Sequence, residues 1–167
     1  MKRAYGVAML VLAALTVGRL AAAEPARVAV FDFELVDTSL QGEVEGANPE
    51  DQARLALISA ELRERLQASG RYEVVDVTPI AEEIAAAGYL RSCNGCEARL
   101  AQAVDADLAL IGWVQKVSNL ILNINVGIRD AATREQVFAA SVDIRGNTDE
   151  SWLHGIRYLL KNRLLKE

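Results

Sequence analysis

Cys93 and Cys96 stand two residues apart in the segment SCNGCE and are the only cysteines of the chain. A C-x-x-C pair can close a disulfide, exchange electrons with other thiols, supply half of a zinc site or attach a c-type haem. Haem attachment needs a histidine directly after the second cysteine, where this chain has Glu97. A structural zinc needs four ligands, and the chain offers two cysteines and one histidine. We therefore predict no metal and no cofactor, and a disulfide and a redox pair remain.

The N-terminus indicates which of these two the compartment favours. Lys2 and Arg3 precede an apolar run over residues 7–17, and small residues follow at Ala21 and Ala23. This pattern is typical of a secretory signal peptide, so we predict that residues 1–23 are removed and that the mature protein, residues 24–167, is exported to the periplasm as a single domain without a membrane span. Neighbouring thiols close in an oxidising compartment, which predicts a disulfide between Cys93 and Cys96.

A periplasmic thiol-disulfide oxidoreductase that uses the same two cysteines is the alternative. A C-x-x-C pair at the N-terminus of a helix gains thiolate character from the helix dipole, and a helix is expected to begin near Asn94, with Asn94 and Glu97 as its capping residues. The thioredoxin arrangement has the pair directly after a strand, whereas a helix and a short loop precede it here. The order of elements therefore favours the disulfide.

Other catalytic parts do not come together in the sequence. Carboxylates cluster around the first strand and the loop after it, but without the spacing of a calcium loop, so we expect a solvated acidic loop rather than a cation site. The sequence contains no glycine-rich phosphate loop, no G-x-S-x-G motif and no histidine near a candidate nucleophile. We predict a protein that is not an enzyme. The carboxylates are Asp32, Glu34, Asp37, Glu43 and Glu45.

The charge of the chain excludes one class of partner. The formal net charge is −5. The charged residues of the predicted signal peptide are all basic, so the mature chain has a more negative net charge. A nucleic-acid binder needs a basic surface. We predict no nucleic-acid partner and expect a periplasmic protein partner instead.

The elements that must position these residues alternate between strands and helices. An apolar run over residues 28–35 predicts a first strand, and Asn48 with Pro49 begins a helix that ends near Gly70. Two further strands over residues 71–77 and 105–117 enclose two short helices. The order β-α-β-α-α-β-β-β-α predicts an α/β (α+β) fold with a mixed five-stranded sheet and helices mainly on one face.

The C-terminal strands alternate apolar and polar residues with a period of two. Leu120, Leu122, Ile124 and Val126 are expected to face the helices, which leaves a polar face on the other side of the sheet. Asparagine is depleted in strands, so its presence there favours binding. We predict that this face docks a partner and that replacing Asn123 and Arg129 together changes the stability little. The predicted contact residues are Asn119, Asn123, Asn125, Arg129, Ser141, Asp143 and Arg145.

Three segments carry a resemblance to known families. VAVFDFE, RYEVVD and DADLALIGWV resemble the N-terminal α/β domain of TolB and related domains of CsgG-like and LpoB-like envelope proteins. SCNGCE, GWVQKVSNLILNIN and DIRGNTDESW resemble an exported bacterial family of unknown function over nearly the whole mature chain. The resemblance implies a TolB N-terminal-like fold, a non-catalytic binding or adaptor role in the envelope, and an association with periplasmic quinoprotein alcohol dehydrogenase systems.

Overall fold

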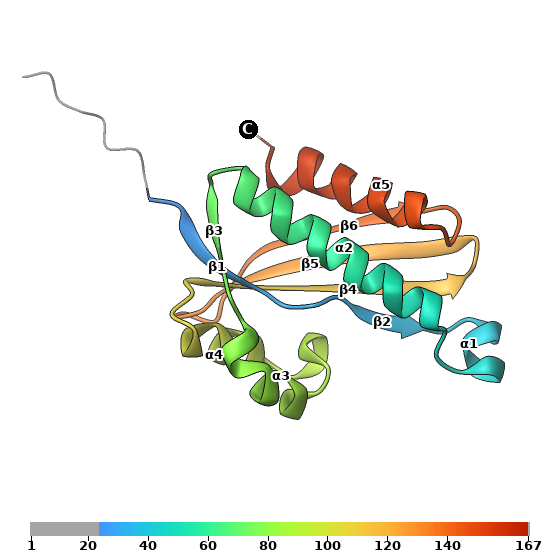
Figure 1. Cartoon of the computed structure of the whole chain (residues 1–167), viewed down its shortest axis with the longest axis horizontal. Helices are drawn as coiled ribbons and strands as arrows, with labels where there is room; N and C mark the ends of the chain where they lie inside the picture. The colour runs from blue at the N-terminus through green and yellow to red at the C-terminus, as the bar shows by residue number, and fades with distance from the viewer. Residues whose placement is uncertain (1–23, 167) are drawn as a thin grey trace, which may run out of the picture.

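The computed structural model describes residues 24–166 and arranges them as one sheet flanked by helices (Figure 1). The predicted signal peptide lies outside the described residues. The strands are β1 Ala26–Val30, β2 Glu34–Asp37, β3 Tyr72–Val75, β4 Leu108–Ser118, β5 Ile121–Asp130 and β6 Gln136–Ile144. The α-helices are α1 Leu40–Glu45, α2 Pro49–Ala68, α3 Ala81–Ala87, α4 Cys96–Ala103 and α5 Asp149–Leu159. Short helical turns are η1 Thr78–Ile80, η2 Leu90–Ser92 and η3 Leu160–Leu164.

The sheet is mixed, as predicted, with β4 at its centre. Its strand order is β3-β1-β4-β5-β6, and β2 also pairs with β4, beyond the end of β1. β1 pairs in parallel with both β3 and β4, and β2 pairs in parallel with β4. β4, β5 and β6 form an antiparallel meander. The sheet has six strands. The prediction of five was wrong because the run over residues 28–35 supplies parts of two strands.

The break between β1 and β2 follows from the packing of two phenylalanines. Phe31 belongs to one hydrophobic cluster of the molecule and Phe33 to the other, so the two rings lie on opposite faces of the sheet. In an unbroken strand, residues two apart point to the same face. The Arg63 guanidinium donates to the Val30 carbonyl at 2.8 Å, and the Ser59 hydroxyl accepts from the Phe33 amide at 3.0 Å. The backbone groups freed by the break are therefore satisfied by side chains of α2.

Helices cover both faces of the sheet, not mainly one as predicted. α2 and α5 pack side by side on one face, around Ile58, Leu62 and Trp152 (Figure 1). On the other face α3 and α4 cover β1 and the first part of β4, where Leu90 and Leu100 bury Phe31. The reason is that α4 carries its own apolar stripe, which must also leave water. We call residues 78–103 the disulfide lobe.

Local capping signals located the longest helices correctly. Asn48 caps α2 by accepting from the Glu50 amide, and Thr148 caps α5 by accepting from the Ser151 amide. The acidic segment after β2, predicted as a loop, instead contains the short helix α1, capped by Ser39. No helix among residues 24–166 is long and apolar enough to cross a bilayer.

An ion pair is buried on the face of the sheet that α2 and α5 cover, beneath the start of α2. Lys116 of β4 and Asp51 of α2 are both fully buried, with 2.6 Å between Nζ and Oδ2. Asp37 of β2 lies 3.5 Å from the same ammonium group, and Asn147 donates to Asp51 at 2.8 Å. Asn147 in turn accepts from the Trp152 indole at 2.9 Å. The network thus joins the centre of the sheet to both helices of this layer.

Removing one partner of this pair should strongly destabilise the protein. We expect Lys116→Met to lower the free energy of unfolding by about 2–3 kcal/mol, because the buried Asp51 would keep only Arg54, at 3.0 Å, as a cationic partner. Urea unfolding followed by circular dichroism measures the change. Gln115→Met, on the exposed side of the same strand, is the control and should shift stability by no more than about 0.5 kcal/mol. A wild-type unfolding midpoint for Lys116→Met would show that the pair contributes nothing.

Candidate functional site

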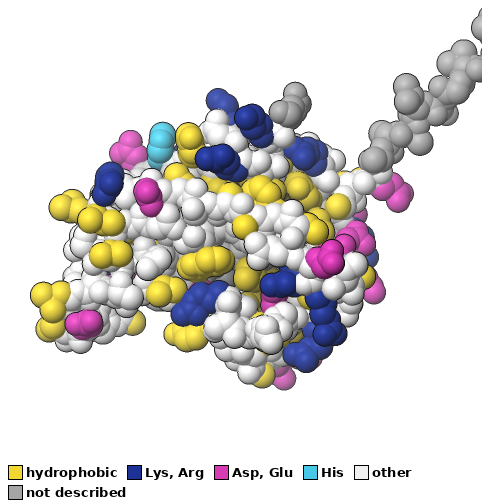
Figure 2. Space-filling model, turned by 180° about the vertical axis from the view of Figure 1, so that it is seen from behind, with side chains coloured by type: hydrophobic (Ala, Val, Ile, Leu, Met, Phe, Trp, Pro, Cys, Tyr) yellow, Lys and Arg dark blue, Asp and Glu magenta, His cyan; other side chains and the backbone are white. Residues whose placement is uncertain are grey.

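The face of the sheet opposite α2 and α5 is covered only in part. Beyond the disulfide lobe, side chains of β4, β5 and β6 reach the surface as a mixture of apolar and neutral polar groups (Figure 2). The register places Gln115 opposite Asn123 and Asn123 opposite Asp143. We call this surface the open face. Its central residues are Trp113, Gln115, Asn123, Asn125, Ser141 and Asp143.

The structure brings four of the seven predicted contact residues together on this face. Asn123 donates to Asp143 at 2.8 Å, and Asn125 lies opposite Ser141 on the neighbouring strand. Asn123 and Asn125 are half-buried, whereas Ser141 and Asp143 are exposed. The alternation of the sequence therefore located the open face correctly.

Two other predicted residues lie outside the open face. Asn119 is in the turn between β4 and β5, where its amide donates to Gln41 and its oxygen accepts from Asn147. Arg145 follows the end of β6, beside the start of α5, where its carbonyl accepts from Ser151. Leu120, predicted to face the helices, is 71% exposed in the same turn as Asn119. The strand alternation was extended too far at both ends, because turns end the period of two.

Arg129 points to the predicted face but is not available as a free contact residue. Its Nε donates to the Glu97 carboxylate at 2.6 Å, and its Nη1 donates to the Arg134 carbonyl at 2.6 Å. Glu97 is only 2% exposed. This pairing argues against the prediction that Arg129 can be replaced without loss of stability, because Arg129 lies against a buried carboxylate.

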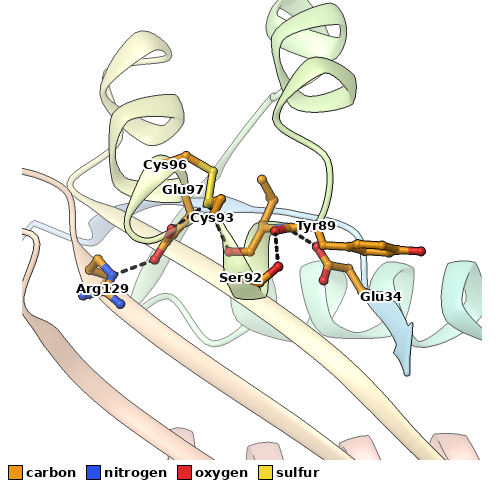
Figure 3. Close-up of a disulfide and its surroundings, with 8 residues drawn as sticks. Glu34, Tyr89, Ser92, Cys93, Cys96, Glu97 and Arg129 are labelled. Carbon is orange, nitrogen blue, oxygen red and sulfur yellow. Dashed lines mark hydrogen bonds and ion pairs between the residues drawn. A yellow bond between two sulfur atoms is a disulfide. The ribbon is translucent and has the colours of Figure 1, made fainter. Parts of the chain in front are cut away.

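Glu97 also lies against the cysteine pair (Figure 3). Cys93 and Cys96 form a disulfide with 5.5 Å between their Cα atoms, and Cys93 Sγ lies 3.4 Å from Glu97 Oε2. Asn94 and Gly95 both have positive φ in the tight loop between the cysteines, and Gly95 is the N-cap of α4 without a side-chain hydrogen bond. The predicted capping by Asn94 and Glu97 was wrong, because Glu97 turns to Arg129.

A pocket of about 300 Å³ lies where the disulfide lobe meets the open face. Its floor is the sheet, where Gly127 leaves a hollow beside Ile111, and Trp113 of the same strand as Ile111 also lines the pocket. Its wall is the loop that carries the disulfide, and its end is the pair formed by Glu97 and Arg129. We call it the lobe pocket. The remaining lining residues are Leu90, Arg91, Ser92, Asn94, Gly95, Ala109, Ile111, Ile128, Gln136 and Ala139.

A second acidic residue, Glu34, contacts two lining residues of the pocket, Leu90 and Arg91. Glu34 of β2 accepts from the Leu90 amide at 2.5 Å, and its second oxygen lies 3.8 Å from Nε of Arg91. Burial raises the pKa of the Glu34 carboxyl, although the Leu90 and Arg91 amides and the Arg91 guanidinium act in the opposite direction. Arg91 lies over the Tyr89 ring at 4.7 Å. Glu34 and Glu97 thus each hold one arginine of the pocket.

The described residues do not form a cation site from the acidic cluster near the first strand. Asp32 pairs with Arg63, and Asp37 accepts from the Ser39 amide and lies beside Lys116. Among residues 24–166, one group brings three potential metal ligands within 4.8 Å of one another: Cys93, Cys96 and Glu97. Both sulfurs of that group are joined in the disulfide, so neither is available as a thiolate.

Sequence reasoning missed several residues of the pocket. A glycine inside a strand signals a bulge or a close approach, so Gly127 could have been singled out. Trp113 was hidden by a strand that carries apolar residues on both faces, and Arg91 lies in a turn without any recognisable motif. Glu34 was predicted at the end of the first strand and counted with a solvated acidic cluster, although β2 directs it beneath the disulfide lobe.

The ion pair of Arg129 can be tested by mutation. We expect Arg129→Ala to lower the free energy of unfolding by about 2 kcal/mol, because the buried Glu97 would lose its cation. Arg99→Ala, at an exposed position of α4, is the control. In a Glu97→Gln background the Arg129→Ala substitution should cost much less, since no charge is then stranded. Equal losses in both backgrounds would contradict the pairing.

The disulfide predicts a simple mass measurement. Protein recovered from an oxidising compartment should not react with an alkylating reagent until it is reduced, because Cys93 and Cys96 are joined. After reduction, its intact mass should increase by the hydrogens added to the two sulfurs, and both thiols should then be alkylated. Complete alkylation without a reductant would disprove the bond in the isolated protein.

Solved structures with a similar fold come from several bacterial proteins. The C-terminal domain of LpoB from Escherichia coli is 13% identical, with a TM-score of 0.52 over 71% of this chain and 82% of that one. Lipoprotein GNA1162 from Neisseria meningitidis is 16% identical, with a TM-score of 0.52 over 86% and 99%. The PelC dodecamer from Paraburkholderia phytofirmans is 13% identical, with a TM-score of 0.50 over 83% and 89%. These likenesses confirm the α/β fold, including the predicted resemblance to LpoB.

Sequence comparison gives the family but no function. No curated protein sequence matches this chain. The family model DUF3280, described as a protein of unknown function (DUF2380), matches residues 26–164. The match covers almost the whole of the described chain, in agreement with the resemblance to a family of unknown function. The chain therefore belongs to this family.

Proposed function

We propose that the protein is a non-catalytic binding or adaptor protein of the bacterial periplasm, and that its open face docks a protein partner. The observation that carries this proposal is a half-covered sheet face with a pocket at its border. On the opposite face, α2 and α5 bury the apolar side chains of β4 and β5, whereas the disulfide lobe leaves β5 and β6 accessible on this side (Figures 1 and 2).

The composition of the open face suits a protein surface. Trp113 is half-buried and lies opposite Asn125, whose partner on β6 is Ser141, and Val137 of β6 is 56% exposed. Mixed apolar and amide surfaces of this kind are typical of contacts between proteins, in which aromatic groups supply area and amides supply both donors and acceptors. The strands also hold these side chains at fixed spacing, so little order has to be gained on binding.

The periplasmic location rests on the predicted signal peptide and on the cysteine pair. A disulfide is stable in an oxidising compartment. The fold agrees with this location, because proteins that share it include a lipoprotein, GNA1162. The resemblance to an exported family further suggests a role as an accessory of a quinoprotein alcohol dehydrogenase system, and that association remains a prediction.

A thiol-disulfide oxidoreductase is the rival function, and one contact favours it. The Glu97 carboxylate, 3.4 Å from Cys93 Sγ, could accept the proton of a thiol formed on reduction. Against it, Cys96 is only 7% exposed and Cys93 is half-buried behind the pocket wall. A substrate disulfide would have to reach a sulfur that the lobe covers, so the geometry favours a structural bond.

Mutation of the open face tests the proposal by capture of partners from periplasmic extract. We expect Asn125→Ala with Gln115→Ala to weaken capture of a partner about ten-fold while leaving the unfolding midpoint almost unchanged, because both side chains lie outside the core. The control is Lys161→Ala, at an exposed position of η3 on the opposite layer.

Two results would contradict the adaptor function. The first is equal capture by the wild-type protein and the open-face variant. The second is turnover in an insulin reduction assay that disappears in Cys93→Ser, which would support the oxidoreductase instead. A partner lost only from the open-face variant supports the proposal.

A further inference from the structure

Two arginines line the lobe pocket, and each is held from behind by a carboxylate. Arg129 uses Nε and Nη1 for Glu97 and the Arg134 carbonyl, and its Nη2 makes no hydrogen bond to any of residues 24–166. Arg91 lies beside Glu34 and over the Tyr89 ring, and its guanidinium likewise makes no hydrogen bond within the described chain. The pocket therefore presents unused N–H donors from two positioned guanidinium groups.

The anions that hold these arginines are shielded from a ligand. Glu97 contributes to the end of the pocket but is only 2% exposed, and the Glu34 side chain is 14% exposed beneath the lobe, outside the pocket lining. A carboxylate behind a guanidinium fixes its orientation, whereas its outward N–H groups still attract an anion. Figure 2 shows arginine and lysine side chains along the top edge and at the lower right of this view, the latter with acidic side chains beside them, in a chain that is acidic overall.

Between the arginines the floor of the pocket is apolar and shallow. Ile111 and Trp113 supply carbon surface, and Gly127 has no side chain to fill the space above it. Ligand pockets usually enclose about 300–1,000 Å³, so this one is at the small end. It fits one apolar side chain with a neighbouring carboxylate and is too small for a dinucleotide.

We propose that the lobe pocket binds an acidic residue and an adjacent apolar side chain of an extended partner segment. The apolar side chain lies over Gly127 against Trp113, and the carboxylate accepts from Arg91 or Arg129. This inference rests on the proposed adaptor function and specifies the chemistry of the partner at the same face.

The pocket is continuous with features that suit an extended chain. Asn125 and Asn123 continue along β5 from Gly127, on the same face. Alternate residues of an antiparallel strand are about 6.8 Å apart, which is also the repeat of peptide groups along one side of an extended chain. A free small acid would occupy the pocket alone and leave these amides without a partner. Charge complementarity and continuity therefore favour a segment of protein.

Selection from a phage-displayed library of random eight-residue peptides tests the proposal, with the full chain exported by its own N-terminal segment as bait. We expect enriched peptides to carry Asp or Glu next to Leu, Ile, Phe or Trp. A synthetic copy of an enriched peptide is then measured by fluorescence anisotropy. Gly127→Val, which fills the hollow, and Arg91→Gln should each weaken its binding about ten-fold. Arg99→Gln, an exposed α4 arginine outside the pocket, should bind normally.

The substitutions are chosen so that loss of binding cannot be confused with unfolding. A Cβ on Gly127 would meet only Ile111, at 3.9 Å, and valine is favoured in strands, so Gly127→Val should fold normally. Ala139→Leu, at an exposed position of β6, is a second variant that blocks the pocket. Thermal unfolding of each variant confirms its integrity.

Each remaining outcome decides against the inference in a recognisable way. Enrichment of basic or uncharged peptides, or wild-type binding by Gly127→Val and Ala139→Leu, would overturn the pocket as the acidic-segment site. Competition by N-acetyl-leucine at the concentration of the peptide would identify a free acid as the ligand. If no peptide is enriched but the open-face variant still loses its periplasmic partner, this inference fails and the adaptor function stands.

Discussion

The ammonium group of Lys116 is enclosed by protein with the Asp51 carboxylate 2.6 Å away, and neither side chain reaches water. Burial of both charges is tolerable because the two lie next to each other, with Asp37 near the ammonium group and Arg54 bonded to Asp51. The pair thereby fixes the distance between the central strand and the start of α2. Through Asn147 and Trp152 the same network holds the start of α5. Glu97 and Arg129 make an analogous link between α4 and β5 on the opposite face. One acid–base pair on each side thus aligns the helical layers with the sheet that they share.

The two faces of the sheet differ in how completely they are covered, and the candidate site lies where the cover ends. α2 and α5 close one face with large aliphatic side chains and Trp152. The disulfide lobe is smaller and packs on alanines of β1 and β4, so it stays close to the sheet and ends over Ile111. At this border the backbone of the lobe, its disulfide and the arginines are all held by buried groups. A site built on such supports changes little in shape when it binds, which favours recognition over catalysis by moving parts.

Local signals in the sequence were sufficient to predict the helices and strands. They did not predict contacts between residues that are far apart in the chain. The caps at Asn48 and Thr148, and the alternation over β5 and β6, depend on neighbouring residues only, and the structure agrees with them. Lys116 follows an apolar run, and nothing near it in the chain indicates that Asp51 will neutralise it in the core. Arg129 fitted the polar side of the strand pattern, yet Glu97, 32 residues earlier, determines its environment. The second helical layer was missed for the same reason, because the apolar side of α4 does not reveal which face of the sheet it covers.

The number of residues in the break between β1 and β2, around Asp32, determines which face of the sheet the side chains of β2 occupy. Before the break, even-numbered residues such as Val30 face α2; after it, odd-numbered residues such as Leu35 do. Across this segment, odd-numbered and even-numbered residues therefore exchange the faces of the sheet to which they point. Shortening it by one residue would exchange the sides of β2, and would bring the Glu34 carboxylate into the hydrophobic layer and Leu35 towards the disulfide lobe. For this strand, the number of residues determines which side chain supports the pocket.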